Sequence, residues 1–317
     1  MHIRKLVKAG QASHTVSLPK DWITKNKLNK GSVVYIEEKS DAELLVTPQM
    51  HQQREPAKKE LTISIDNKDQ GTIQRELTAA YVNNYSSIIF SGKQVEKNAK
   101  LLRSIVQEFV ALEVADQSAS HMIVKDLLNL EEISIEQTLR RMDMIIRSML
   151  KDSIAALEGK HVLDKIEYKD EDINRLYFLL YRLLKSALID SHFAEKLSLS
   201  NAEILGRWYL IVNLENVADC GKNICKILSS LEKNQDKEKL KELYHQIQES
   251  YELAMKSFFS KNKNSADDVA KRRIPLFDVC DSYFEKNKTA QTALLIEQFK
   301  SMESLICNIA RIVIDHE

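Results

Sequence analysis

The stretch 240–258, LKELYHQIQESYELAMKSF, repeats apolar residues at intervals of three or four positions. These residues are Leu240, Leu243, Ile247, Tyr251, Ala254 and Phe258. Such spacing places them on one face of an α-helix, as a helical bundle requires. The same periodicity runs from residue 134 to residue 317, and only short polar breaks interrupt it. The sequence therefore predicts six helices of about 25–30 residues in this half.

The breaks divide the six helices into three plus three, and they fall at 158–160, 197–200, 233–236, 261–264 and 287–288. Ser134 and Ser200 each have Gln or Glu three residues later, which is typical of a helix start. Glu215 in the third helix and Glu303 in the sixth are separated by about the length of three helices and their turns. A duplicated three-helix unit, spanning 134–231 and 236–317, explains this pattern.

Residues 61–130 alternate strand and helix patterns in the order βαβαββ. The predicted strands are 61–65, 86–90, 112–115 and 120–125, and the predicted helices are 71–83 and 95–109. This small α/β domain has no glycine-rich phosphate loop, so we interpret it as a spacer or dimer-forming module. The polar segment 49–60, which contains Pro56, is predicted to be a linker.

Residues 1–48 indicate four short strands and one short helix. The strands are expected at Ile3–Val7, His14–Leu18, 32–36 and 43–46, and the helix at 20–26, directly after Pro19. A unit of this size cannot bury much apolar surface alone, and it has no disulfide or metal to stabilise it. We therefore expect it to fold as a homodimer.

The charge of the chain is balanced overall but uneven along its length. Lys and Arg total 46, as do Asp and Glu, yet residues 1–30 hold seven basic residues against Asp21 alone, a net of +6. A basic end on a neutral protein indicates a polyanionic partner. The candidate DNA-binding residues are Arg4, Lys5, Lys8, Ser13, His14 and Lys20, whose donors suit phosphates and guanine edges. The alternative is a solvated charged hairpin.

This N-terminal run resembles the AbrB/SpoVT family of swapped-hairpin DNA-binding domains. The resemblance rests on Arg4-Lys5-Leu6-Val7, Gly10, Ser13, residues 16–22, and the later Gly31. It implies that two chains interleave their hairpins into one small β-barrel that binds DNA, with Leu18 and Trp22 in its core. Antitoxins also belong to this family, so binding of a toxin is a second possibility.

The segment Leu214-Glu215-Asn216-Val217-Ala218-Asp219, continuing to Asn223-Ile224, is similar to the PhoU motif. Residues 152–157 and 171–177 resemble the flanking helix signatures. The resemblance implies two three-helix bundles that regulate phosphate uptake, and some members bind metal clusters at these acidic motifs. An AbrB-like head before a PhoU-like body resembles the archaeal phosphate-uptake regulators.

Glu215, Asp219 and Asn223 recur every four residues, so their oxygens share one helix face and could bind a divalent metal or iron. One helix supplies too few ligands, and a second must contribute. The candidates are Glu167, Asp170 and Glu171, or Asp278, Asp281 and Glu285. The second repeat has Cys307 and Arg311 in place of the aspartate and asparagine, which disfavours a second site. A polar bundle surface is the alternative.

Other patterns exclude several classes of function. Glu242 and His245 have the spacing of a di-iron ligand pair, but they lie off the apolar seam, in solvent. The four cysteines lack zinc-ligand spacing and are expected to be reduced thiols in helices. No catalytic grouping is evident, so we do not expect an enzyme. No signal peptide or membrane-spanning segment is expected, and the predicted location is cytoplasmic.

Together these patterns predict a multidomain, mainly α protein with a swapped-hairpin β-barrel head, a small α/β middle domain and two PhoU-like three-helix bundles. The predicted function is a DNA-binding transcriptional regulator of phosphate uptake, acting as a homodimer or higher oligomer. The alternative is a PhoU-like adaptor that binds a phosphate transporter or sensor protein without binding DNA.

Overall fold

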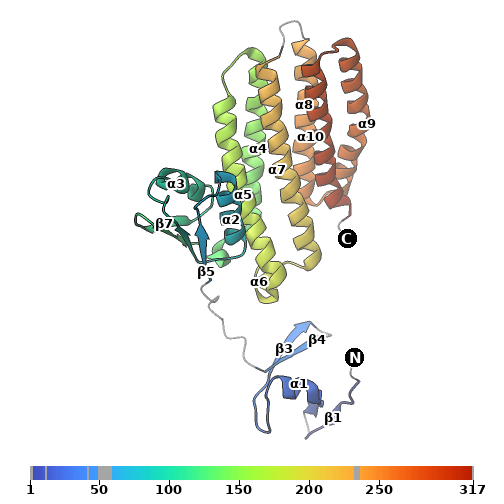
Figure 1. Ribbon diagram of the computed structural model, residues 1–317. Helices are drawn as coiled ribbons and strands as arrows, with labels where there is room; N and C mark the ends of the chain where they lie inside the picture. The colour runs from blue at the N-terminus through green and yellow to red at the C-terminus, as the bar shows by residue number, and fades with distance from the viewer. Residues whose placement is uncertain (1–2, 11–12, 41–42, 49–58, 232–235, 316–317) are drawn as a thin grey trace. The chain divides into compact units, whose positions relative to one another are not determined.

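The computed structural model describes residues 3–10, 13–40, 43–48, 59–231 and 236–315. The chain forms two compact units, 1–58 and 59–317. Most of the predicted linker, 49–58 with Pro56, lies outside the described residues. The fold class is as predicted: small hairpins at the N-terminus, a small mixed sheet in the middle, and a long helical C-terminal region (Figure 1).

The N-terminal unit consists of two separate antiparallel hairpins and one short helix. Strand β1 (Val7–Lys8) pairs with β2 (His14–Thr15), and β3 (Tyr35–Ser40) pairs with β4 (Glu43–Thr47). Helix α1 (Lys20–Lys25) begins directly after Pro19, as expected. The first two strands are shorter than predicted, because within one chain β1 and β2 pair only with each other at the turn.

The middle domain has the predicted βαβαββ order. Its elements are β5 (Glu60–Ser64), α2 (Gln70–Val82), β6 (Ser87–Ser91), α3 (Ala99–Gln107), β7 (Leu112–Gln117) and β8 (His121–Asp126). The sheet order is β5-β6-β8-β7, in which only β5 and β6 are parallel. Alternate strand residues such as Ile63, Ile88 and Phe90 are buried, as expected for a sheet covered on one face.

Helix α3 starts four residues later than predicted. The preceding segment instead forms turns in which the Glu96 amide donates to the Ala119 carbonyl. Val95, the apolar residue at the predicted helix start, is nevertheless fully buried. It therefore packs into the core from a turn rather than from a helix.

The C-terminal region contains the six predicted long helices. They are α4 (Ile135–Ser153), α5 (Leu163–Ile189), α7 (Asn201–Ser229), α8 (Lys237–Ser260), α9 (Lys263–Lys286) and α10 (Ala290–Ile314). The short helix α6 (Ser191–Lys196) lies in one of the breaks, and α4 ends in a 3₁₀ turn at Ile154–Glu158. Ser200 and Glu203 form a complete capping box at the start of α7.

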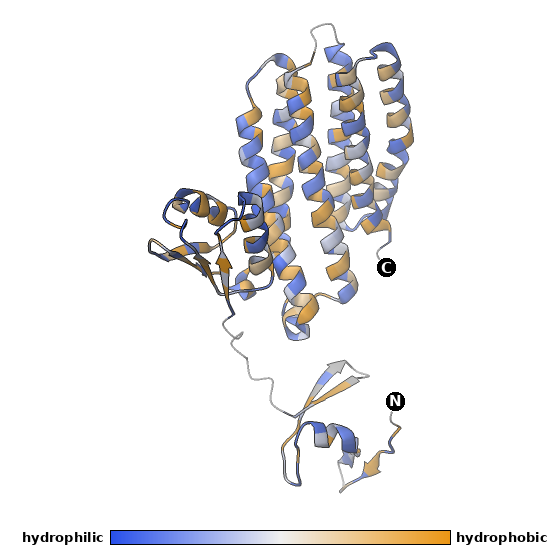
Figure 2. Ribbon diagram, viewed as in Figure 1, coloured by the Kyte–Doolittle hydropathy of each residue, from blue (hydrophilic) through white to orange (hydrophobic). Residues whose placement is uncertain are grey.

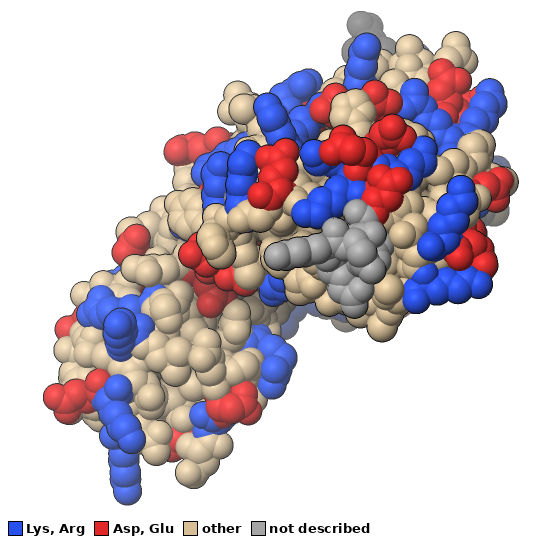
Figure 3. Space-filling model, turned by 90° about the horizontal axis from the view of Figure 1, so that it is seen from above, with Lys and Arg blue, Asp and Glu red and all other residues tan. Residues whose placement is uncertain are grey.

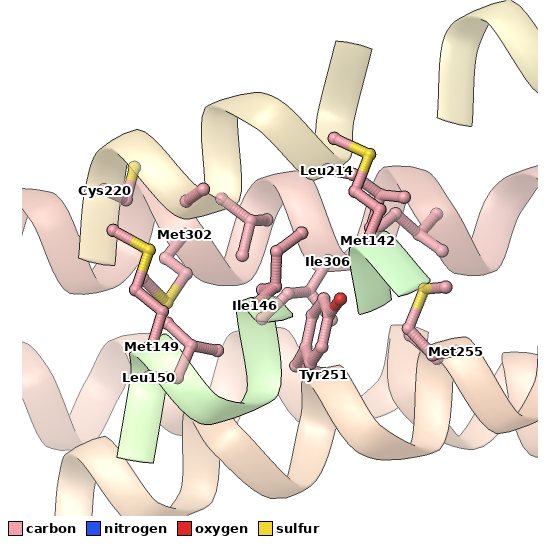
Figure 4. Packing of buried hydrophobic residues seen from close by; sticks show 14 of the residues in the cluster. Met142, Ile146, Met149, Leu150, Leu214, Cys220, Tyr251, Met255, Met302 and Ile306 are labelled. Carbon is pink, nitrogen blue, oxygen red and sulfur yellow. The ribbon is translucent and has the colours of Figure 1, made fainter. Parts of the chain in front are cut away.

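The two three-helix units pack against each other, and their buried residues form one continuous core. Figure 4 shows side chains of α4, α7, α8 and α10 meeting there, among them Met142, Leu214, Tyr251 and Met302. Helices α7 and α10 run antiparallel, with the Asn308 amide donating to Asn213 Oδ1 at 3.1 Å. At Gly221, a Cβ atom would lie 3.0 Å from Leu150 Cδ2, so glycine permits this close approach.

The middle domain packs against the helical body through a buried ion pair. Arg182 of α5 binds Asp126 at the end of β8, and both side chains are almost fully buried. The Arg182 Nε donates to Asn84 Oδ1 at 2.6 Å, and the guanidinium lies over the Tyr81 ring, 4.7 Å from its centroid. Phe178 of α5 adds an aromatic contact to Phe109 at 5.5 Å.

Many charged side chains on the outer surface of the helices form ion pairs. In the view from above, basic and acidic side chains are interspersed over this region (Figure 3). Glu242 pairs with Lys239 at 2.8 Å and His245 with Glu249 at 3.4 Å, and Glu242 and His245 are largely exposed. The prediction that these two residues face solvent is confirmed.

All four cysteines are free and buried, in α7, α9 and α10, as predicted for helix-packed thiols. Among the described residues, no helix is both long and apolar enough to cross a lipid bilayer.

Candidate nucleic-acid interface and acidic helical site

The first hairpin places three of the candidate DNA-binding residues at one turn. Lys8 lies directly opposite His14 in the β1–β2 register. The Ala9 amide donates to the Ser13 carbonyl at 2.9 Å, and the Ser13 hydroxyl donates back to the Ala9 carbonyl. Gly10 adopts a positive φ of 88°, which a turn of this tightness requires and glycine adopts without strain.

The other three candidates lie outside this turn. Arg4 and Lys5 precede β1, and Lys20 is the first residue of α1. Arg4, Lys5, Lys8 and Lys20 are all exposed, and none forms an ion pair with the described residues. Their charges are therefore free to meet phosphates.

None of the described side chains of the N-terminal unit is buried. Eight of its large apolar side chains instead face solvent, with exposed fractions between 39% and 82%: Ile3, Leu6, Val7, Val16, Val33, Tyr35, Ile36 and Leu44. Leu18 and Trp22, predicted to form a core, are only partly buried, because one chain provides no second layer to cover them. So much exposed apolar surface on so small a unit marks an interface.

A lysine of the same helix pairs with the acidic motif of α7 and neutralises part of its charge. Lys222 Nζ lies 2.6 Å from Asp170 Oδ2 on α5 and 2.7 Å from Asp219 Oδ1. Burial, together with the nearby carboxylates of Asp219 and Asp170, raises the pKa of Glu215 to about 7. The site thus gathers three carboxyl groups around one ammonium group.

The described residues do not provide a metal centre of the predicted kind. They contain no group of three or more His, Cys, Asp or Glu side chains placed to hold one ion. Lys222 lies between two of the expected ligand helices, and Asn223 is exposed. Of the other candidates, Glu167 faces Lys226 at 3.6 Å and Glu171 is exposed. This geometry disfavours a metal, and metal binding at Glu215, Asp219 and Asn223 stays a prediction.

The second repeat has replaced the acidic site with a buried carboxyl group. Glu303 is fully buried, and burial raises its pKa to about 7. Cys307 Sγ lies 4.0 Å from Glu303 Oε1, while Arg311 is exposed. The remaining candidates Asp278, Asp281 and Glu285 are exposed on α9, where Glu285 pairs with Lys288 at 2.6 Å.

Sequence reasoning missed the part played by Lys222 and the burial of Glu303. A lysine three residues after Asp219 was a visible signal, because residues three apart on a helix are neighbours. The burial of Glu303 had no comparable signal, since it depends on the packing of α8 and α9 against α10.

Two family models match the chain. The model described as "PhoU domain" matches residues 139–228, which run from α4 to α7. The model described as "Antidote-toxin recognition MazE, bacterial antitoxin" matches residues 12–53, so Ser13, His14 and Lys20 lie inside it and the earlier cations do not. No curated protein matches the chain, and no solved structure does.

Both matches fall where the sequence predicted an AbrB-like head and a PhoU-like body, and both families are regulatory rather than catalytic. The chain therefore joins an N-terminal segment that is similar to the MazE family to a helical body in which residues 139–228 match the PhoU domain.

Proposed function

We propose that this chain is a transcriptional regulator of phosphate uptake that binds DNA as a dimer. Paired N-terminal hairpins contact the DNA, and the helical body responds to a signal or partner. One observation carries the proposal: the described N-terminal unit exposes its unpaired cations together with eight large apolar side chains, and it buries no side chain. A second copy would cover the apolar side chains and double the positive charge.

Salt dependence tests the DNA contact. If about six phosphates are neutralised, log affinity for duplex DNA should fall against log salt with a slope of about −5. The probe is a pool of random-sequence duplexes. Because the dimer carries each residue twice, Arg4→Ala/Lys5→Ala should weaken binding and make the slope shallower by about 4.

The matched control removes two exposed lysines of the helical body, as Lys160→Ala/Lys271→Ala. This control should leave affinity and slope unchanged. A flat salt response of the unmodified chain, or equal losses in both double variants, would remove DNA binding from the proposal.

Mapping of chromatin occupancy tests the regulated genes. Enrichment at promoters of phosphate-transport genes supports regulation of phosphate uptake. Occupancy without such enrichment would leave a DNA-binding protein with other targets.

The PhoU match favours a second function, an adaptor that binds a phosphate transporter or sensor protein. The full-length Arg4→Ala/Lys5→Ala variant separates the two functions in a pull-down from nuclease-treated extract. Recovery of transporter components, combined with no DNA affinity in the unmodified chain, favours the adaptor.

Elemental analysis of the purified chain and of Asp219→Ala tests the metal prediction. Stoichiometric metal that is lost in Asp219→Ala would support it. Its absence from both would leave Lys222 as the cation of the acidic site.

A further inference from the structure

The outward face of α7 begins with a stripe of apolar and aromatic side chains. Leu205, Trp208 and Tyr209 have exposed fractions of 64%, 40% and 36%. Val212, one turn further on, is partly buried. Intervals of three and four residues place these side chains on one side of the helix. We call Leu205, Trp208, Tyr209 and Val212 the α7 stripe.

Neighbouring residues extend the apolar surface at this end of the body. Leu188 and Ile189, in the last turn of α5, are 62% and 76% exposed. Helices α5 and α7 run antiparallel, and Lys222 meets Asp170, so the last turn of α5 lies level with the first turns of α7. Figure 2 shows hydrophobic colour where α6 leads into α7.

The same face of α7 becomes acidic directly after the stripe. Glu215 follows Val212 by three residues, and Asp219 follows by seven. Lys222 pairs with Asp219 and with Asp170 of α5, and Glu215 forms no ion pair with it, so the described carboxyl groups here outnumber the ammonium group. A face of 15 residues, from Leu205 to Asp219, spans about 21 Å at the helical rise. It is therefore apolar at one end and under-neutralised at the other.

We propose that this face of α7 is a docking surface for an amphipathic helix of a partner protein that carries Lys or Arg. The apolar side of the partner helix covers the α7 stripe, and its cations pair with Glu215 and Asp219. Trp and Tyr are the residues that most often dominate binding energy at such interfaces. Positive charge on the partner helix neutralises the carboxylate charge that Lys222 alone leaves unbalanced.

Charge complementarity disfavours a second copy of this chain as the occupant when the two faces overlap along their whole length. In an antiparallel two-fold pairing, the carboxylates of one α7 would lie against the apolar stripe of the other. In a parallel two-fold pairing, they would lie against each other. Both arrangements bury or oppose uncompensated negative charge, which is unfavourable. The proposal is independent of DNA binding by the N-terminal unit.

Peptide binding to the full-length chain tests the proposal. The probe is a fluorescent 18-residue amphipathic helix of Leu and Lys, and the comparison peptide replaces every Lys by Glu. Binding is measured by anisotropy in EDTA. We expect saturable binding of one Lys peptide per chain, and at least tenfold weaker binding of the Glu peptide. In a Trp22→Phe background, Trp208 is the sole tryptophan, and its emission should shift to the blue on binding.

Variants locate the binding to this face. Trp208→Ala should weaken the Lys peptide about thirty-fold, and Glu215→Gln/Asp219→Asn about fivefold. The control variants Ile274→Ala and Glu252→Gln remove an apolar and an acidic side chain that are more exposed than Trp208 and Asp219 but lie elsewhere on the body, and they should have no effect. Circular dichroism checks that every variant is folded.

Three outcomes would overturn the proposal. The first is equal binding of the Lys and Glu peptides, and the second is unchanged binding to Trp208→Ala. The third is self-association of the bodies that Trp208→Ala abolishes in sedimentation, because it would make a second copy the occupant.

Discussion

The N-terminal unit and the helical body differ in how much of their apolar surface one chain can cover. No described side chain of the N-terminal unit is buried, and eight of its large apolar side chains face solvent. In the body, both three-helix units pack into one core whose central residues, such as Ile146, Leu183 and Phe299, are fully buried. One chain thus completes the core of its helical body but leaves the apolar side chains of its N-terminal unit uncovered.

The largest expected effect is loss of the dimer. Ile36 and Leu44 are each 65% exposed on β3 and β4, and Ile36→Asp/Leu44→Asp would place charges in the expected interface. Because the N-terminal unit has no core of its own, we expect the molar mass of the chain to fall to that of a monomer. Size-exclusion chromatography with light scattering measures this change.

Ile274→Asp is the control for that experiment, since Ile274 is equally exposed on the body. It should leave the dimer intact. A monomeric unmodified chain with a structured N-terminal unit would contradict the comparison.

The second effect concerns the contact between middle domain and body. Arg182→Ala leaves Asp126 buried without its partner, which costs about 3–5 kcal/mol of unfolding free energy. Urea denaturation followed by circular dichroism measures the loss. Lys271→Ala, which removes an exposed partner of Asp267, should cost less than about 1 kcal/mol. Equal losses in the two variants would contradict a structural role for Arg182.

The third effect is a pH dependence of stability that arises in the helical body. Burial raises the pKa of Glu303 from 4.5 to about 7, while Ser250 and the nearby Arg272 and Arg273 oppose the shift. The folded state therefore binds this proton more tightly than the unfolded state, and stability is lost as pH rises from about 4.5 through about 7.

Glu303→Gln removes that titration. Between pH 4 and pH 8, the unfolding free energy of this variant should rise by about 3 kcal/mol relative to that of the unmodified chain. Urea denaturation at a series of pH values measures the gain. Glu252→Gln changes an exposed residue, so its unfolding free energy should depend on pH in the same way as that of the unmodified chain. If the unfolding free energy of Glu303→Gln also followed the pH dependence of the unmodified chain, Glu303 would not titrate as described.

The smallest expected effect concerns the first residues of helices, which are capped differently in the body and in the N-terminal unit. Ser200 and Glu203 cap α7 reciprocally, whereas Pro19 starts α1 without a side-chain hydrogen bond. Ser200→Ala should cost about 1 kcal/mol in thermal or urea unfolding. Asn201→Ala, one position later, should cost less, and the reverse order would contradict the capping role of Ser200.

The sequence predicted those features that depend on local periodicity. The six long helices, the βαβαββ order and the helix after Pro19 follow from residue spacing and turn chemistry. The incomplete N-terminal unit followed from its size and its lack of cross-links.

Features that depend on distant packing were not predictable in this way. Arg182 and Asp126 are far apart in the sequence, and nothing local marks them as partners. The single shared core arises because α7 and α10 pack directly together, with Asn213 and Asn308 in contact. At the acidic motif, the long side chain of Lys222 reaches both Asp170 and Asp219, and its position depends on how α5 packs against α7.

Helix α5 has a mechanical consequence for the molecule. It is one uninterrupted helix that carries Asp170 at the acidic site and, twelve residues later, Arg182 at the middle domain. These positions lie about 18 Å apart along the axis. A helix of this kind resists compression, so an axial push on Asp170 displaces Arg182 with it. Through the ion pair of Arg182 with Asp126, such a displacement would also reach the middle domain.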